Sequence, residues 1–122
     1  MFKNRTSRRI VLVAWLAFAS AQAPAYVCQG VVKGVSVDTS GDVLVQSVGM
    51  SMIWPRFCSV VQAANGVAPG ACKVLYTQFL TAQTTGRAVT VWIHGDANDT
   101  NACATLVGWQ YVPGFYFLTL ND

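Results

Sequence analysis

The sequence contains few charged residues. Glutamate is absent, charged residues make up 11% of the chain, and there is a single histidine. The four cysteines contain no C-x-x-C spacing, which argues against a zinc site. Paired carboxylates, an activated nucleophile and a metal cluster are equally hard to find, so we expect no catalytic residues, no cofactor and no metal. The composition is therefore typical of a binding or structural protein rather than an enzyme.

The first nine residues carry half of the positive charges. Four Lys and Arg residues precede an apolar run from Ile10 to Ala19, which is too short to be a permanent membrane span. Small residues follow, and we place a signal-peptide cleavage after Ala25; an uncleaved N-terminal anchor is the alternative. Residues 1–25 are thus predicted to be a secretory signal, and residues 26–122 a single secreted or periplasmic domain without a membrane span.

Removing the signal reverses the sign of the net charge. The formal charge of the whole chain is +3, but residues 26–122 hold four Lys and Arg against five Asp, a net charge of −1. The four bases are scattered singly, whereas a nucleic-acid surface needs them clustered. We therefore expect no nucleic-acid partner.

The cysteines that remain in residues 26–122 are even in number. In a small exported domain this indicates two disulfides. Three pairings are possible, and we favour Cys58 with Cys72 and Cys28 with Cys103.

Hydrophobic alternation predicts a mainly β domain. Strands are expected at 30–37, 42–48, 56–61, 87–94 and, broken near Pro113, 106–120. Apolar residues spaced by three and four from Cys72 predict one helix, which ends where Gly86 takes a left-handed conformation. Residues 64–71 are expected to form a loop. This order predicts a five-stranded, OB-fold-like Greek-key barrel with one helix between strands 3 and 4, plugging one end.

Aromatic side chains gather near the end of the chain. Adjacent strand residues point to opposite faces, so Tyr116 is expected to face away from Phe115 and Phe117. Some of these rings should lie outside the barrel, where they could stack on a sugar or against a neighbouring subunit. Filling the core and covering its rim is the alternative.

The polar loop that follows His94 has two further readings. Asp96, Asn98 and Asp99 faintly resemble a calcium loop, but later positions depart from that pattern, and we interpret the segment as a turn. Asn98-Asp99-Thr100 is also a glycosylation sequon, which matters only in a cell that glycosylates exported proteins.

The segment from Cys72 to Val91 resembles the helix-to-strand region of the B subunits of subtilase cytotoxin and typhoid toxin. The shared features are Leu75, Gln78, Thr85-Gly86 and the V-x-V strand that starts at Val89. Weaker similarity covers Gly30–Val32 and Ala104–Gly108.

This resemblance implies a pentameric OB-fold subunit that binds glycans. Gln29 stands where the family has a sugar-contacting serine, and Trp92 keeps one of two paired aromatic positions. We therefore place the predicted ligand site at Gln29, Trp92 and His94, with Trp92 stacking and Gln29 hydrogen bonding. We interpret His94 as a surface residue at a strand end rather than a catalytic group. The alternative function is a periplasmic structural or assembly protein that binds no glycan.

Overall fold

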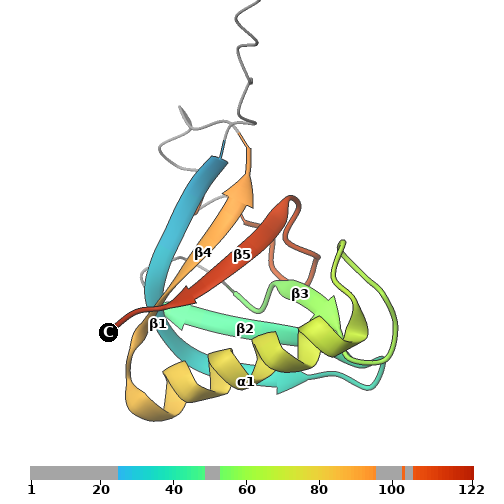
Figure 1. The fold of residues 1–122 in the computed structure, drawn as a ribbon, viewed down its shortest axis with the longest axis horizontal. Helices are drawn as coiled ribbons and strands as arrows, with labels where there is room; N and C mark the ends of the chain where they lie inside the picture. The colour runs from blue at the N-terminus through green and yellow to red at the C-terminus, as the bar shows by residue number, and fades with distance from the viewer. Residues whose placement is uncertain (1–24, 49–52, 96–102, 104–105) are drawn as a thin grey trace, which may run out of the picture.

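The computed structural model describes residues 25–48, 53–95, 103 and 106–122, and within these ranges it is mainly β (Figure 1). Five strands and one helix follow in the predicted order. They are β1 (Ala25–Val37), β2 (Asp42–Val48), β3 (Arg56–Ser59), α1 (Pro69–Thr85), β4 (Ala88–His94) and β5 (Phe115–Leu120).

The five strands form one antiparallel sheet in the order β3-β2-β1-β4-β5. β1 is the longest strand because it serves two neighbours: residues 25–31 pair with β4, and residues 31–37 pair with β2. The β1–β2 register shifts between Val32 and Gly34, and such a bulge bends a strand and increases its twist. The sheet therefore curls, with β4 and β5 in one half and β2 and β3 in the other (Figure 1).

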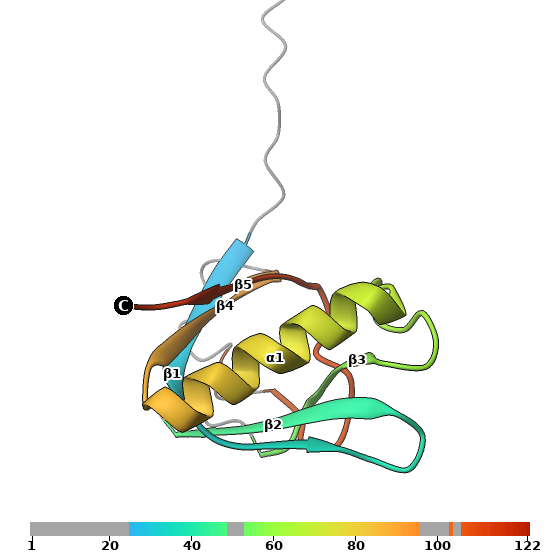
Figure 2. The same ribbon diagram turned by 60° about the horizontal axis from the view of Figure 1, so that its bottom comes forward.

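α1 lies between these two halves of the sheet (Figure 2). It contacts all five strands, and its buried side chains are Cys72, Phe79 and Ala82. Gly86 has φ 69°, which confirms the predicted left-handed end of the helix. The predicted loop at 64–71 is too long, because the helix begins at Pro69. Proline suits the first helical turn, since its φ is already helical and its missing N–H would have no partner there.

The core lies between the helix and the curled sheet. Phe57 of β3 is fully buried, and its ring centroid is 5.0 Å from those of Phe79 in α1 and Phe115 in β5. One side chain thus joins the helix to both edge strands of the sheet.

The described sheet is not closed into a barrel. β3 and β5 stand at opposite edges, and only a single parallel bridge between Arg56 and Tyr111 connects the chain on the two sides. Arg56 N donates to Gln110 O at 2.7 Å, and Val112 N donates to Arg56 O at 2.9 Å. Barrel closure remains a prediction.

Two of the predicted strands are too long. The third ends at Ser59 rather than Val61, because Ser59 Oγ accepts the N–H groups of Val61 and Gln62 and turns the chain. The last is a strand only from Phe115 to Leu120. Left-handed backbone at Trp109 (φ 66°) and Gly114 (φ 78°) prevents a continuous strand through 106–114.

Two disulfides are present, in the two pairings that the sequence favours. Cys28 in β1 bonds to Cys103, and Cys58 in β3 bonds to Cys72 in α1. The described ranges contain no free cysteine. Within the same ranges, no helix has the length and apolar character needed to cross a membrane. The predicted signal segment lies outside the described residues, except that Ala25 is the first residue of β1.

Candidate binding surface

The three predicted ligand-binding residues lie on one outward face of the sheet. Gln29 pairs with Thr90, Val27 with Trp92, and Ala25 with His94. Residues directly opposite each other in an antiparallel pair share a face, and alternate residues along a strand share it too. The intervening residues Cys28, Val91 and Ile93 are buried, so the face that carries Gln29, Trp92 and His94 is turned away from the core.

β5 adds two further rings to this face. Phe117 contacts Trp92 with ring centroids 6.2 Å apart at 66°, and Tyr116 stacks on His94 with centroids 3.9 Å apart at 15°. Phe117 and Tyr116 are 51% and 45% exposed. We call this surface the aromatic face; its members are Val27, Gln29, Trp92, His94, Tyr116 and Phe117.

The predicted alternation of the last aromatic residues is wrong. Phe115 is buried, whereas both Tyr116 and Phe117 are exposed. The cause is a bulge: Phe117 pairs with Trp92 and Phe115 pairs with Ile93, so Tyr116 has no partner in the ladder. Gly114 starts the irregularity, because its carbonyl accepts the N–H of His94 at 2.8 Å and a Cβ there would lie 2.5 Å from His94 O.

Polar groups of the neighbouring strands orient the rings. Trp92 Nε1 donates to Thr119 Oγ1 at 3.4 Å, and Asn121 Nδ2 donates to Thr90 Oγ1 at 3.1 Å. The exposed side chain of Gln29 lies in the adjacent row and offers both donors and acceptors. Such a surface can stack against an apolar ring face and hydrogen bond at its margin.

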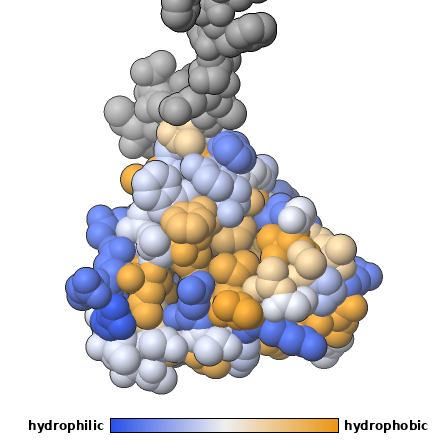
Figure 3. Space-filling view, in the orientation of Figure 1, coloured by the Kyte–Doolittle hydropathy of each residue, from blue (hydrophilic) through white to orange (hydrophobic). Residues whose placement is uncertain are grey.

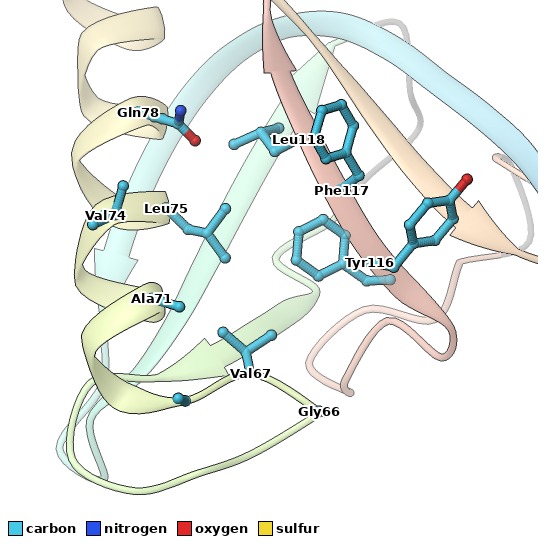
Figure 4. Close-up of a pocket in the computed structure, with 11 residues that line it drawn as sticks. Gly66, Val67, Ala71, Val74, Leu75, Gln78, Tyr116, Phe117 and Leu118 are labelled. Carbon is cyan, nitrogen blue, oxygen red and sulfur yellow. The ribbon is translucent and has the colours of Figure 1, made fainter.

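A groove runs between β5 and α1, and apolar side chains gather along it (Figure 3). Its volume is about 510 Å³, and no charged residue lines it. Leu75 of α1 and Leu118 of β5 project into it from opposite sides, and Val67 closes one end (Figure 4). β5 is an edge strand of the sheet, and its residues 115–118 line this groove.

Sequence reasoning missed a charged cluster at the turn between β1 and β2. Arg56 Nη1 contacts Asp42 Oδ2 at 2.6 Å and also pairs with Asp38, while Tyr111 donates its hydroxyl to Asp42 Oδ1 at 2.5 Å. Arg56 Nε donates to Trp109 O at 2.9 Å. The cluster therefore joins the β1–β2 turn to β3 and to the segment that precedes β5.

Hydrogen bonding within this cluster shifts three pKa values. The Ser40 hydroxyl, the backbone N–H of Asp42 and Arg56 together lower the pKa of Asp38 from 3.8 to about 2. Burial and the hydrogen bond to Asp42 raise the pKa of Tyr111 from 10.0 to about 12. Hydrogen bonding to Asp38 and Asp42 raises the pKa of Arg56.

Two tryptophans lie beside the cluster. Trp54 and Trp109 stack with ring centroids 6.3 Å apart at 25°, and both have left-handed backbone, with φ 53° and 66°. The sequence separates them by more than fifty residues, and each lies in a turn rather than in a strand with a readable period. No pattern in the sequence could therefore have brought them together.

The remaining sequence predictions concern residues 96–100. The calcium-like turn and the sequon at Asn98 lie outside the described residues. Among the residues that the structure does describe, no three His, Cys, Asp or Glu side chains are grouped so as to hold a metal ion.

Comparison with known proteins does not identify a family. No family model, no curated protein and no solved structure matches the chain.

Proposed function

We propose that this protein is an exported, non-enzymatic domain that binds a glycan through the aromatic face. The observation that carries this proposal is the gathering of exposed rings on one rigid surface. The four rings come from two paired strands, Trp92 and His94 from β4 and Tyr116 and Phe117 from β5. β4 also pairs with β1, which carries the Cys28–Cys103 disulfide. Isolated exposed rings need no explanation, but several in contact mark an interaction site.

Sugar recognition suits the chemistry of this surface. The apolar face of a pyranose ring can stack on an indole or phenol ring, while its hydroxyl groups bond to polar side chains at the margin. Trp92 is the stacking residue in this proposal, and Gln29 supplies the hydrogen bonds. His94 is stacked on Tyr116 and extends the platform.

We further propose that the domain is an OB-fold-like barrel of the toxin B subunit type. The strand order β3-β2-β1-β4-β5, the position of α1 between β3 and β4, and the parallel bridge between Arg56 and Tyr111 support this. Secretion or a periplasmic location is supported by the two disulfides, which persist in oxidising compartments. A domain of the toxin B subunit type would assemble into a ring of five copies.

A glycan array tests the binding proposal. The array is probed with the exported, processed protein, with Trp92→Ala, and with Val61→Ala as a control for an exposed apolar residue outside the aromatic face. The proposal expects wild type and Val61→Ala to share the same glycans and Trp92→Ala to lose them. If wild type binds nothing at millimolar sugar, or if Trp92→Ala binds unchanged, the proposal fails.

A second candidate function is an assembly protein that pairs with a partner along β5. Asn121 N donates to Ala88 O at 2.9 Å, and alternation along the ladder then turns the backbone groups of Leu118 and Leu120 away from β4. The uncharged groove beside this edge fits an extended apolar peptide that adds one strand to the sheet.

Size-exclusion chromatography with light scattering separates the two candidates. A pentamer supports the toxin-like reading, and a monomer favours a separate partner at β5. Val74→Lys, at a residue of the groove that is 60% exposed, would then weaken peptide capture but leave glycan binding by the aromatic face intact.

A further inference from the structure

A small pocket lies beside the stacked tryptophans, away from the aromatic face. Its volume is about 320 Å³, at the lower end of the range for small-molecule sites. It is lined by Ser36, Asp38, Leu44, Trp54, Arg56 and Trp109. The strand β1 supplies residues to both regions, but no residue belongs to both.

The two indole rings are held in place by strained backbone. Bulky residues rarely adopt positive φ, and where they do the surroundings must enforce it. Trp109 N donates to Trp54 O at 3.0 Å, and Gly108 packs so closely that a Cβ there would lie 2.5 Å from Ile53 O. Strain of this kind gathers at binding sites. Here it presents Trp109 with 59% of its surface exposed.

The polar wall of the pocket has hydrogen-bonding capacity to spare. Arg56 uses Nε for Trp109 O and Nη1 for Asp38 and Asp42, whereas Nη2 donates to no described residue. The hydroxyl of Ser36 is on an exposed residue of the same wall. Asp38 Oδ1 already accepts three hydrogen bonds, from Ser40 and from Asp42 N, whereas Oδ2 accepts one, from Arg56. The wall therefore offers a guanidinium donor, one carboxylate oxygen and a hydroxyl beside a flat apolar surface.

The charge of the wall selects among ligands with this chemistry. Asp38 and Arg56 line the pocket, and Asp42, which is buried behind them, also pairs with Arg56, so the charged cluster as a whole carries a net charge of −1 and repels an acidic ligand. A neutral hydroxylated ring is not repelled. Its hydroxyl groups can donate hydrogen bonds to a carboxylate, and such charge-assisted bonds are stronger than bonds between neutral groups.

We propose that this pocket, formed by Trp54, Trp109, Arg56 and Asp38, is a second binding site that takes one ring of a neutral saccharide. Trp109 stacks on the ring, and Arg56 and Asp38 bind its hydroxyl groups. The site works independently of the aromatic face, so either can exist without the other.

Indole NMR signals test this site directly. The chain has four tryptophans, and removal of the signal segment takes away Trp15, so Trp54, Trp92 and Trp109 each give one Nε1–H signal. These signals are assigned with single Trp→Phe variants. The exported, processed protein is then titrated with glucose and galactose, and separately with glucuronic acid and sialic acid, up to tens of millimolar.

We expect glucose or galactose to shift the Trp54 and Trp109 signals with saturation, and the two acids to leave them unchanged. Trp109→Ala should weaken this binding at least tenfold. Val107→Ala, equally exposed at 59% and two residues away, should not. Ser36→Tyr, which fills the pocket and leaves Trp54, Trp109, Arg56 and Asp38 in place, should also abolish the shifts.

Three results would overturn the inference. One is the absence of any shift of Trp54 and Trp109 with neutral sugars. Another is an equal response to the acidic sugars, which contradicts the charge argument. The third is unchanged binding in Trp109→Ala and Ser36→Tyr. A shift of Trp92 alone also removes this site while supporting the aromatic face. Shifts of Trp54 and Trp109 without Trp92 support this site, and the aromatic face is then decided by the glycan array.

Discussion

The aromatic face and the tryptophan pocket are built in opposite ways. The face consists of alternate positions on β1 and β4 and two successive positions at the bulge of β5, and its rings contact one another without any charged group among its strand partners. The pocket consists of residues from three strands and three turns or bends, and ion pairs between Arg56 and two aspartates hold its polar side. The first surface follows from the period of a sheet, whereas the second exists only once the chain has folded.

The core beneath both regions should show the largest effect. Phe57 lies next to Arg56 in sequence and contacts Phe115, the residue before Tyr116. Phe57→Ala leaves a cavity at a fully buried site and should lower the free energy of unfolding by about 4 kcal/mol, as measured by urea denaturation. A loss below about 1 kcal/mol would mean that the two regions do not share one core.

The two disulfides should differ in how much they contribute. Cys28–Cys103 anchors the strand under the aromatic face and spans 75 residues, whereas Cys58–Cys72 lies next to the pocket and spans 14. A longer closed loop constrains the unfolded chain more. Replacing both cysteines of a pair by alanine should cost about 4 kcal/mol for the first pair and about 3 kcal/mol for the second. Urea denaturation measures the loss in free energy of unfolding for each pair. A larger loss for Cys58–Cys72 than for Cys28–Cys103 would contradict the prediction.

The charged cluster should make stability depend on pH at both extremes. Folding lowers the pKa of Asp38 from 3.8 to about 2, so its stabilisation is complete above pH 4 and is lost as the pH falls towards 2. Folding raises the pKa of Tyr111 from 10.0 to about 12, so its contribution is complete below pH 10 and is lost as the pH rises towards 12.

Thermal melts across this pH range measure both limbs. Asp38→Asn should flatten the acid limb, because asparagine does not titrate. Asp122→Asn is the control, since the side chain of Asp122 is fully exposed beside Arg87. An unchanged acid limb in Asp38→Asn would show that the cluster is not the source of the pH dependence.

The smallest effect on stability should come from the aromatic face itself. Phe117 is 51% exposed, so Phe117→Ala should change the free energy of unfolding by no more than about 0.5 kcal/mol. The same variant should bind the glycan identified on the array about tenfold more weakly, because Trp92 loses its contact ring. A large loss of stability with unchanged binding would make the face a structural surface only.

Much of the fold follows from local sequence. Alternation at Val89, Val91 and Ile93 gave β4 to within one residue, Asp38–Gly41 marked the β1–β2 turn, and Gly86 ended the helix as expected. The shared face of Gln29, Trp92 and His94 was not predicted from strand parity, because Gln29 and Trp92 were chosen by the family resemblance. The predicted first strand starts at residue 30, whereas β1 begins at Ala25, and the five added residues provide the pairing with β4 that places Gln29 on this face.

The rest depends on contacts between distant residues. The bulge at Tyr116 comes from Gly114 bonding to His94, and no alternation rule contains it. Trp54 meets Trp109 only because the chain around β3 lies beside the segment before β5. Arg56 meets Asp38 because β3 pairs with β2 next to the β1–β2 turn. Neither pair leaves a period or a spacing that sequence analysis could read.

Amide chemical-shift mapping of the processed protein, titrated with the glycan that binds most strongly on the array, tests the central claim most directly. The aromatic face as the recognition surface predicts shifts concentrated at residues 26–29, 90–94 and 116–119. Shifts confined to α1, β2 and β3, or no saturable shifts at all, would contradict it.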